Sequence, residues 1–386
     1  MDPVELQAWL RLTLTPGIGN DAARRLLAAF GLPQAIFDQP STALRQLLTP
    51  AQASALAQPP DTLAAQLRAT LDWLDAAQAG VARRVITLGD AAYPAPLLAT
   101  EDPPCLLYAM GQVPGSAGAP HWPHRALAMV GSRNPTPQGA QNARQFARAL
   151  AASGVTVVSG LALGIDGAAH EGALDGASAD LLATVAVVGT GIDRVYPRQH
   201  LDLAHRIAAR GVIVSEYPLG TPPLPPNFPK RNRLIAGLSQ GTLVVEAALQ
   251  SGSLITGRLA VEQGKEVFAI PGSIHSPQSR GCHALIRQGA KLVETAQDVL
   301  EELRWPGTVN AITIEASDGV QTAHSADTSH EDELLQALGA DPVSLDALLA
   351  RTGLDTATLQ AGLLTLELDG RVGRLPGGLF QRLGSA

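Results

Sequence analysis

Glycine-rich turns with polar side chains follow two predicted strands in the middle of the chain. Ala126–Val130 leads into Gly131-Ser132-Arg133, and Val155–Val158 leads into Ser159-Gly160-Leu161-Ala162. Glycine turns expose backbone N–H groups, and an arginine offers a fork of donors that fits phosphate oxygens. Since the carboxyl ends of parallel strands meet at one edge of a sheet, we expect these groups to form an anion site.

A cationic cluster with an aromatic neighbour follows a later strand. The proline-rich segment Tyr217–Pro229 is predicted to be a loop that ends in Lys230-Arg231-Asn232-Arg233. Phe228 precedes the cluster and could stack on a base, an interaction of about 1–3 kcal/mol. Glu246 is the sole acidic residue between Thr221 and Gln250. Phosphate binding is favoured for Arg133, Lys230 and Arg231, so the sequence predicts a track for a single nucleic-acid strand.

Two arginines leave a structural alternative open. Arg233 and Arg258 could instead form salt bridges inside the fold, with Glu246 or Glu262 as the partner. Nothing in the residue types separates this interpretation from a phosphate contact, and we weigh the two evenly.

Two further glycine-rich stretches resemble cofactor motifs but each lacks a required residue. In Gly189-Thr190-Gly191-Ile192-Asp193-Arg194, Arg194 stands where a dinucleotide fingerprint has its third glycine. In Gly252–Arg258, Arg258 replaces the lysine of a phosphate loop, and Leu259 stands where a magnesium-binding Ser or Thr is needed. We therefore expect no NAD or ATP cofactor.

His170 lies four residues after Asp166, on one face of a predicted helix. Such a pair could bind a metal, but a buried structural pair is favoured, with Asp166 near the positive end of the helix dipole. The spacing of Ser, His and Asp residues suggests no catalytic triad. We expect no catalytic residues, no metal and no enzyme activity.

Buried strands alternate with helical segments through the central region. The strand-length apolar runs are continuous, which is typical of parallel strands covered on both faces, and their spacing predicts a doubly wound, mainly parallel α/β sheet. The predicted strands are Arg84–Leu88, Leu106–Met110, Ala126–Val130, Val155–Ser159, Thr184–Val188, Val212–Ser215, Thr242–Val245 and Glu266–Ile270.

Three other segments flank this region: a helical domain at 1–80, a linker at 305–330 and a compact unit at 331–386. In the first, Leu14–Gly19 resembles a helix-hairpin-helix turn, although an ordinary tight turn is favoured. The last has the helix-helix-helix-wing pattern of a winged helix. Its third helix, Asp355–Asp369, has no Lys or Arg, and the unit has eight acidic and four basic residues. We therefore expect an interaction module rather than a reader of the DNA groove.

Composition limits the possible classes of protein. The 386 residues are 46% hydrophobic and 16% charged, which excludes a disordered protein or a coiled coil. The net charge of −7 argues against a general coat for nucleic acid or membranes. Two distant cysteines fit a reducing compartment, and neither a signal peptide nor an apolar span of about 20 residues is visible. A cytoplasmic protein without membrane contact is expected.

The order of the central motifs resembles the DprA/Smf family over residues 125–300. The matching runs are Gly131-Ser132-Arg133, Ser159–Asp166 with His170, Gly189–Asp193 with Tyr196-Pro197, Ser215–Pro218, Phe228–Ser239, Val245–Ala247, Ser251–Thr256 and Ala269–Ser273. The resemblance implies an extended Rossmann-type domain, at 81–304, that binds and protects single-stranded DNA and loads the recombinase RecA in natural transformation. It also implies a homodimer formed through this domain.

By position, the resemblance assigns DNA-binding roles to ten residues. Arg133, Phe228, Lys230 and Arg231 would line the pocket, and Ser159-Gly160 and Gly252-Ser253 would supply backbone contacts, with Ser132 and Asn232 beside them. The terminal segments suit a sterile-alpha-motif-like domain and a winged helix, whose partner the sequence does not reveal.

Two competing interpretations remain. A phosphoribohydrolase has a similar Rossmann variant, and Glu246 in Gly241–Glu246 loosely resembles that family's Gly-Thr-x-x-Glu element, with one residue more. The phosphate motif that precedes that element is missing here. The third interpretation is a scaffold whose Rossmann domain is inert.

Overall fold

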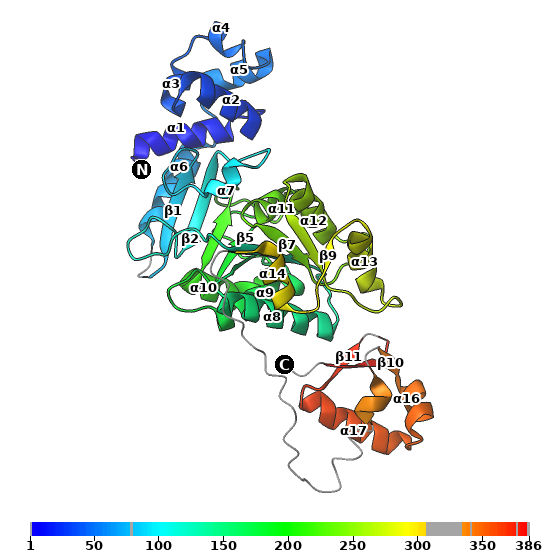
Figure 1. The fold of residues 1–386 in the computed structure, drawn as a ribbon. Helices are drawn as coiled ribbons and strands as arrows, with labels where there is room; N and C mark the ends of the chain where they lie inside the picture. The colour runs from blue at the N-terminus through cyan, green and yellow to red at the C-terminus, as the bar shows by residue number, and fades with distance from the viewer. Residues whose placement is uncertain (1, 78–79, 306–333, 340–341, 376, 384–386) are drawn as a thin grey trace.

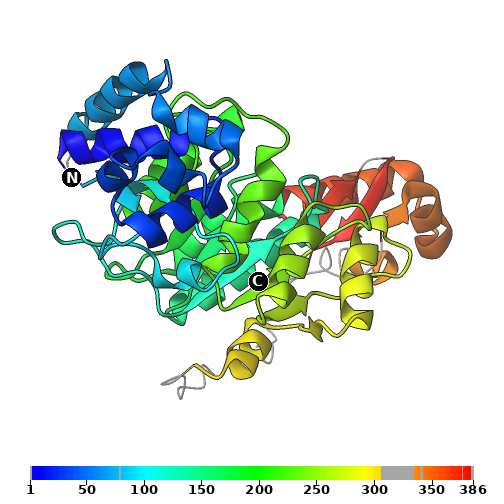
Figure 2. The ribbon, with the colours of Figure 1, turned by 90° about the horizontal axis from the view of Figure 1, so that it is seen from above.

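The computed structural model describes residues 2–77, 80–305, 334–339, 342–375 and 377–383. Helices form the N-terminal part, a large α/β unit forms the centre, and a small α/β unit follows near the C-terminus (Figure 1). The N-terminal helices lie at the β1–β2 edge of the central sheet and α13 lies at the opposite edge (Figures 1 and 2). Almost all of the predicted linker at 305–330 falls outside the described residues.

Among the described residues, nine strands form the central sheet, in the order β1-β2-β6-β5-β4-β3-β7-β8-β9. The strands from β6 to β9 in this order run parallel, whereas β2 is antiparallel to both of its neighbours, β6 and β1. The doubly wound, mainly parallel sheet predicted from the sequence is confirmed. The bounds are β1 Ala82–Thr87, β2 Leu106–Gly111, β3 Ala126–Val130, β4 Thr156–Ser159, β5 Thr184–Val187, β6 Val212–Ser215, β7 Gly241–Val244, β8 Glu266–Ala269 and β9 Lys291–Leu292.

Helices cover both faces of this sheet. One face packs against α8 and α9 through a core that includes Leu127, Phe146 and Ile165, and the other packs against α11 through Leu234 and Ile235. The strands β3 to β7 are buried along their whole length, which explains their continuous apolar sequence. The helices here are α7 Ala95–Leu98, α8 Pro137–Ala152, α9 Ile165–Gly176, α10 Leu201–Arg210, α11 Asn227–Gly237, α12 Ser253–Glu262, α13 Arg280–Arg287 and α14 Ala296–Leu303, with 3-10 turns Arg198–His200 and Pro277–Ser279.

The strand order reverses beside β3. The chain adds β4, β5 and β6 on one side of β3, then crosses over to place β7, β8 and β9 on its other side. In such sheets the loops after the two central strands diverge and leave a crevice beyond their carboxyl ends. The turn after β3, Gly131-Ser132-Arg133, therefore opens at the one edge where this fold provides a binding crevice.

Two buried polar side chains shape the turn after β4. The Asp166 carboxylate accepts hydrogen bonds from the backbone N–H groups of Gly160 and Ala162, at 3.2 and 3.3 Å. Nε2 of His170 accepts from the N–H of Leu161 at 3.3 Å, and this leucine has a φ of 59°. A leucine rarely adopts that left-handed conformation, so the two side chains hold a costly backbone shape. Both are buried as predicted, but they bind the turn rather than each other.

The helix α11 corrects one sequence-based prediction. The Pro-rich loop was predicted to continue to Pro229, yet the helix already begins at Asn227. Proline is tolerated in the first turn of a helix, because the N–H groups there have no intrahelical acceptor. Lys230, Arg231 and Arg233 therefore lie on different sides of one helix instead of forming a cluster on a loop.

A chain of charges links α11 to the N-terminal helices. Arg233 forms an ion pair with Glu216, at the end of β6, and a second with Asp102 at 3.4 Å. Asp102 in turn pairs with Arg24 of α2 at 2.6 Å. The salt-bridge interpretation of Arg233 is correct, but its acids are Glu216 and Asp102 rather than Glu246. Arg24, which follows the predicted Leu14–Gly19 turn, is therefore held by Asp102, and the carbonyl oxygen of Gly17 accepts a hydrogen bond from Gln52 of α5. The turn thus packs within the helical part.

The N-terminal helices bury Trp9, Leu12, Leu26 and Ile36 in a core that continues into one face of the central sheet. Their bounds are α1 Pro3–Leu14, α2 Asn20–Phe30, α3 Pro33–Phe37, α4 Ser41–Leu44, α5 Pro50–Ala57 and α6 Leu63–Asp75. No helix in the described ranges is long and apolar enough to cross a membrane.

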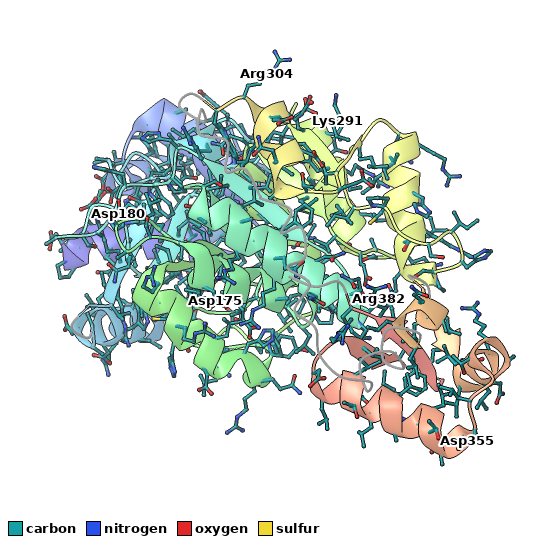
Figure 3. The ribbon with its side chains drawn as sticks, turned by 60° about the horizontal axis from the view of Figure 1, so that its bottom comes forward. Asp175, Asp180, Lys291, Arg304, Asp355 and Arg382 are labelled. Atoms are coloured by element: carbon teal, nitrogen blue, oxygen red, sulfur yellow. The ribbon has the colours of Figure 1, made fainter. Side chains whose placement is uncertain are left out.

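The C-terminal unit combines helices with a small antiparallel sheet. It has helical residues at 334–338, then β10 Val343–Ser344, α16 Leu345–Thr352, α17 Thr356–Leu368, β11 Val372–Leu375 and β12 Leu379–Arg382, in the sheet order β10-β12-β11. This is the predicted winged-helix pattern. Gly373 of β11 lies against Pro137 at the start of α8. Within this unit, Arg382 lies on the side near α8, whereas Asp355, which caps α17, lies at the opposite end (Figure 3).

The buried histidine predicts a pH dependence of stability. Desolvation, with smaller contributions from His200 and Arg231, lowers the pKa of His170 to about 3. Between pH 6.5 and 3, His170 is therefore protonated in the unfolded chain but neutral in the folded chain. The free energy of unfolding consequently falls as pH falls. Between pH 7 and pH 5, the free energy of unfolding of the native chain, measured with urea, should fall by about 2 kcal/mol more than that of His170→Gln.

The matched control is His205→Gln, because His205 is exposed on α10. This variant should keep the pH dependence of the native chain. Equal losses for the native chain and for His170→Gln would show that His170 is protonated in the folded state.

Candidate nucleic-acid interface

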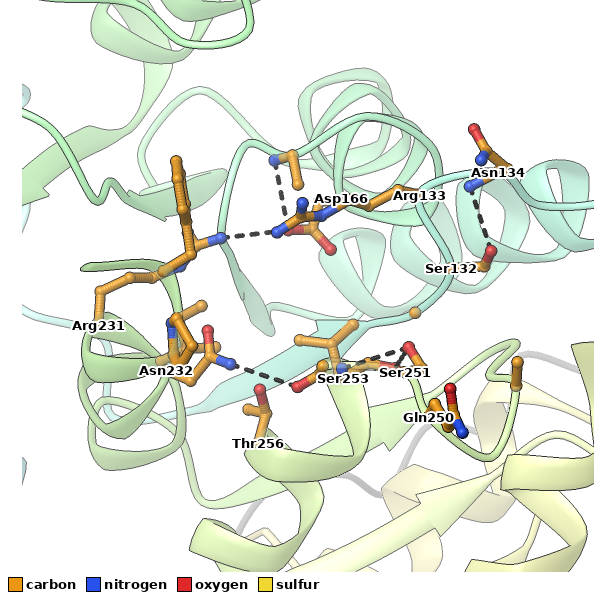
Figure 4. A pocket seen from close by; sticks show the side chains of 18 of the residues that line it. Ser132, Arg133, Asn134, Asp166, Arg231, Asn232, Gln250, Ser251, Ser253 and Thr256 are labelled. Carbon is orange, nitrogen blue, oxygen red and sulfur yellow. Dashed lines mark hydrogen bonds and ion pairs between the residues drawn. The ribbon is translucent and has the colours of Figure 1, made fainter. Parts of the chain in front are cut away.

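The crevice beyond β3 and β7 contains a cavity of about 470 Å³. Its lining comes from the turn after β3, the start of α11, and the loop and first turn of α12, so the sequence brings together residues far apart in the chain (Figure 4). Of the predicted site residues, Ser132, Arg133, Phe228, Arg231, Asn232, Gly252 and Ser253 line it.

Arg133 is the exposed cation of this site. Its guanidinium carbon lies 5.6 Å from the centre of the Phe228 ring, which places the charge over the ring face. Among the described residues, no carboxylate forms a salt bridge with it. The neighbouring Ser132 is buried, and its Oγ accepts the N–H of Asn134 at 3.1 Å. Its side chain thus fixes the turn that presents Arg133.

Phe228 belongs to an aromatic pair that sequence reasoning missed. The centre of its ring lies 5.6 Å from that of Tyr196, and the ring planes are inclined by 40°. Tyr196 is 49% exposed. A second cavity, of about 110 Å³, lies beside this pair and shares Arg133, Ala162, Phe228 and Arg231 with the first. The site therefore has two adjoining cavities with Arg133 and Phe228 in the walls of both.

Arg231 is a structural cation as well as a wall of both cavities. It is 4% exposed, and its Nη1 donates to the carbonyl oxygens of Gly160 and Val187. Its Nη2 lies 3.9 Å from the Asp166 carboxylate (Figure 4). Burial lowers the pKa of Arg231 and raises that of Asp166, and the attraction between the two charges opposes both shifts. Its guanidinium already has these partners, so phosphate binding by Arg231 stays a prediction.

Ser159 and Gly160 stabilise the fold at the end of β4. Ser159 is fully buried and its hydroxyl donates to the carbonyl of Met129 at 2.6 Å. A Cβ on Gly160 would collide with the Arg231 guanidinium, so glycine is required there. Gly160 lines the smaller cavity, whereas Ser159 is not among the residues that line either one. The predicted backbone contact of Ser159 with DNA stays a prediction.

The start of α12 forms the opposite wall of the larger cavity. Gly252 caps the helix, and Nδ2 of Asn232 lies 3.4 Å from its carbonyl oxygen. Ser253 is buried and its hydroxyl bonds that of Ser251 at 2.6 Å. The positive end of the helix dipole favours an anion in this position. Asn232 thus joins α11 to α12, and the serines order the turn.

Two predicted cations lie outside the cavity lining. Lys230 is exposed on the first turns of α11, and Arg258 is exposed on α12. Lys230 therefore does not line either cavity, and its contact with DNA stays a prediction.

Glu246 points away from the cavity. Its carboxylate accepts from the N–H of Thr136 at 2.9 Å and from the Thr136 hydroxyl, at the start of α8. Burial raises the pKa of Glu246, and these hydrogen bonds oppose the rise. It does not line either cavity, so it is not placed to attack or protonate a ligand there.

Several lining residues were given no role from the sequence. Tyr196 lines the smaller cavity, and the larger one includes the polar side chains Asn134, Gln250, Ser251, Thr256 and Gln278. Tyr196 belongs to the Tyr196-Pro197 run of the sequence analysis, but its contact with Phe228 joins residues that are far apart in the sequence. Across the described ranges, no group of three His, Cys, Asp or Glu side chains could hold a metal ion.

The chain matches two protein families along its length. Residues 84–304 match DNA recombination-mediator protein A, and residues 321–378 match the DprA winged helix domain. The second match supports the predicted winged helix and begins inside the segment predicted to be a linker.

Curated relatives agree with this assignment. Protein Smf of Escherichia coli is 42% identical over 308 residues, which cover 78% of this chain and 76% of that protein. The DNA processing protein DprA of Bacillus subtilis is 40% identical over 218 residues, which cover 56% of this chain and 70% of that protein.

Two solved structures share the fold. DprA of Streptococcus pneumoniae has a TM-score of 0.63 and 34% identity, over 78% of this chain and 98% of that one. DNA processing protein A of Helicobacter pylori, whose structure addresses its single-stranded DNA binding mode, has a TM-score of 0.50 and 32% identity, over 57% of this chain and 96% of that one. The chain described here belongs to the DprA/Smf family of DNA processing proteins.

Proposed function

We propose that the central domain binds single-stranded DNA in the two cavities beside Arg133. The observation that carries the proposal is the exposed Arg133 with its guanidinium over the Phe228 ring, in the wall of a cavity that also has amide and hydroxyl side chains. A cation beside an aromatic face suits the alternating phosphates and bases of one strand. Since a duplex hides its base faces, single strands should bind better than duplex, with weak dependence on base sequence.

The family resemblance extends this proposal beyond binding. The protein would protect the strand and load RecA onto it during natural transformation, as a cytoplasmic homodimer formed through the central domain. The relative from Helicobacter pylori with a described single-stranded DNA binding mode supports the DNA part. RecA loading and dimerisation rest on the resemblance.

A binding protein rather than an enzyme fits the geometry better. The phosphoribohydrolase alternative needs a glutamate beside its ligand, and Glu246 instead binds Thr136 at the start of α8. The inert-scaffold alternative does not account for the cavity or for the exposed Arg133 in its wall.

Substitution at the cavity mouth tests the DNA site. Phe228→Ala should weaken binding of a labelled single strand about 5- to 150-fold, because one stacked base is lost. Arg133→Ala should also weaken binding and make log K less steep in log salt, by about 0.7 for one phosphate contact. Fluorescence titration over a range of salt concentrations measures both.

The matched control is Arg258→Ala, since Arg258 is exposed but lies outside both cavities. It should bind like the native chain, and Lys230→Ala should give an intermediate loss. Native affinity in both Arg133→Ala and Phe228→Ala would refute the assignment of this pocket.

Removal of the C-terminal unit should leave strand binding largely unchanged. The helix α17 has no Lys or Arg and is capped by Asp355, so it offers no attraction to phosphates. The measurement compares the full chain with a chain lacking 331–386 in the same titration. A large loss of affinity would show that the winged helix contributes to the DNA site despite its acidic character.

Incubation with nucleoside monophosphates tests the enzyme alternative. We expect no free base, measured by chromatography, since Glu246 does not line the cavities. Release of base that disappears in Glu246→Gln would instead favour the phosphoribohydrolase interpretation.

A further inference from the structure

Two long segments without acidic residues meet beside the candidate DNA site. No Asp or Glu occurs between Asp102 and Asp166, a segment that includes the Arg133 turn and all of α8. None occurs between Asp369 and Ala386, and that segment contains the β11–β12 hairpin, which we call the wing. In a chain whose net charge is −7, these two segments are therefore favourable surfaces for a polyanion.

The wing packs against the first turn of α8. A Cβ built on Gly373 of β11 would lie 2.8 Å from the Cβ of Pro137, so glycine permits this close contact. Gln381, which pairs with Gly373 in the register of β11 and β12, is also buried. Pro137 follows Asn134, a lining residue of the larger cavity, by three positions, so their Cα atoms are at most about 11 Å apart. The wing is therefore an immediate neighbour of the cavity.

Two arginines of the wing are exposed. Arg374 belongs to β11, the edge strand of the small sheet, and its guanidinium carbon lies 5.2 Å from the centre of the Phe380 ring. Arg382 of β12 lies on the side near α8 (Figure 3). In the described part of the chain, no carboxylate forms a salt bridge with either arginine. Their guanidinium groups can therefore bind phosphates.

The chemistry of the wing suits the backbone of a DNA duplex. Phe380 is the single aromatic residue from Arg371 to Arg382 and is 4% exposed, so the wing has no ring on which an unpaired base could stack. A duplex has one phosphate charge per about 1.7 Å of its axis, which favours a surface that offers cations alone. Gly377 and Gly378 lie between the two strands without side chains, so a duplex can approach closely.

We propose that the wing contacts the phosphates of a duplex whose single-stranded end occupies the cavity beside Arg133. The inference rests on the proposed binding of single-stranded DNA. Arg374 and Arg382 attract the duplex, while Arg133 and Phe228 hold the strand, and the packing of the wing on α8 keeps the two surfaces adjacent. The chain thus recognises the junction at which a single strand joins a duplex. The helix α17, which has no Lys or Arg, takes no part, and a strand without a duplex gains nothing from the wing.

The test compares two ligands: a strand of thymidylates, and the same strand joined to a duplex of about 11 base pairs, which is one helical turn. With two phosphate contacts, the native chain should show a slope of log K against log salt that is steeper by about 1.8 for the joined ligand than for the strand. The joined ligand should therefore lose about twelvefold more affinity than the strand between about 50 and 200 mM salt. The double variant Arg374→Ala/Arg382→Ala should lose this difference. It should bind the strand like the native chain, which also shows that it is folded.

Arg351→Ala is the matched control, because Arg351 is an exposed arginine on α16 of the same unit, outside the wing. It should keep the tighter binding of the joined ligand. Gly373→Leu tests the placement of the wing, since a larger side chain there would collide with Pro137. This variant keeps both wing arginines, yet it should lose most of the preference for the joined ligand and still bind the strand.

The possible failures are separable. If the double variant keeps the native preference while Arg133→Ala weakens binding of both ligands, the wing proposal is wrong and the DNA site stands. If a blunt duplex gains as much affinity from the wing as the joined ligand does, the wing does not act together with the cavity, and the proposal is again wrong. If Arg133→Ala and Phe228→Ala both bind the strand like the native chain, the DNA site itself is wrong and the junction proposal falls with it.

Discussion

The buried guanidinium of Arg231 is the contact on which the site depends. It joins α11 to the carbonyls of Gly160 and Val187, which end β4 and β5, and to Asp166 at the start of α9. A charge in the interior costs several kcal/mol unless partners surround it, and here two carbonyls and a carboxylate do so. Asp166 in turn holds the Gly160–Ala162 turn. One cation therefore ties α11 to β4, β5 and α9, and it lies in the wall that the two cavities share.

The helix α11 distributes its charged and aromatic side chains among different tasks. Phe228 faces the cavities, Arg231 faces the sheet, and Arg233 reaches Glu216 and the Asp102–Arg24 pair of the N-terminal helices. Lys230 remains exposed. Because three of these four side chains are held by partners, the exposed positive charge of the site is confined to a small area. That agrees with a chain whose net charge is −7.

The parallel sheet could be predicted because strands buried on both faces leave continuous apolar runs, and β3 and β6 have the predicted bounds. The two-residue β9 is too short for such a signal. The start of α11 was misplaced because its prolines resemble a loop. Residue type could not separate Lys230 from Arg231, since one helical step of about 100° decides which one meets the sheet. Tyr196 was missed because its partner Phe228 is brought near only by the fold.

The placement of β3 between β4 and β7 has a consequence for how the protein is made. The lining of the larger cavity extends in sequence from Val130 to Gln278. On a ribosome that adds about 5–20 residues per second, the cavity therefore stays incomplete for roughly 7 to 30 seconds after β3 has emerged. During that interval β3 lacks the neighbour β7 and exposes an unpaired edge. The nascent chain thus has an aggregation-prone strand before it has a site for DNA, and the same late pairing removes the hazard and completes the site.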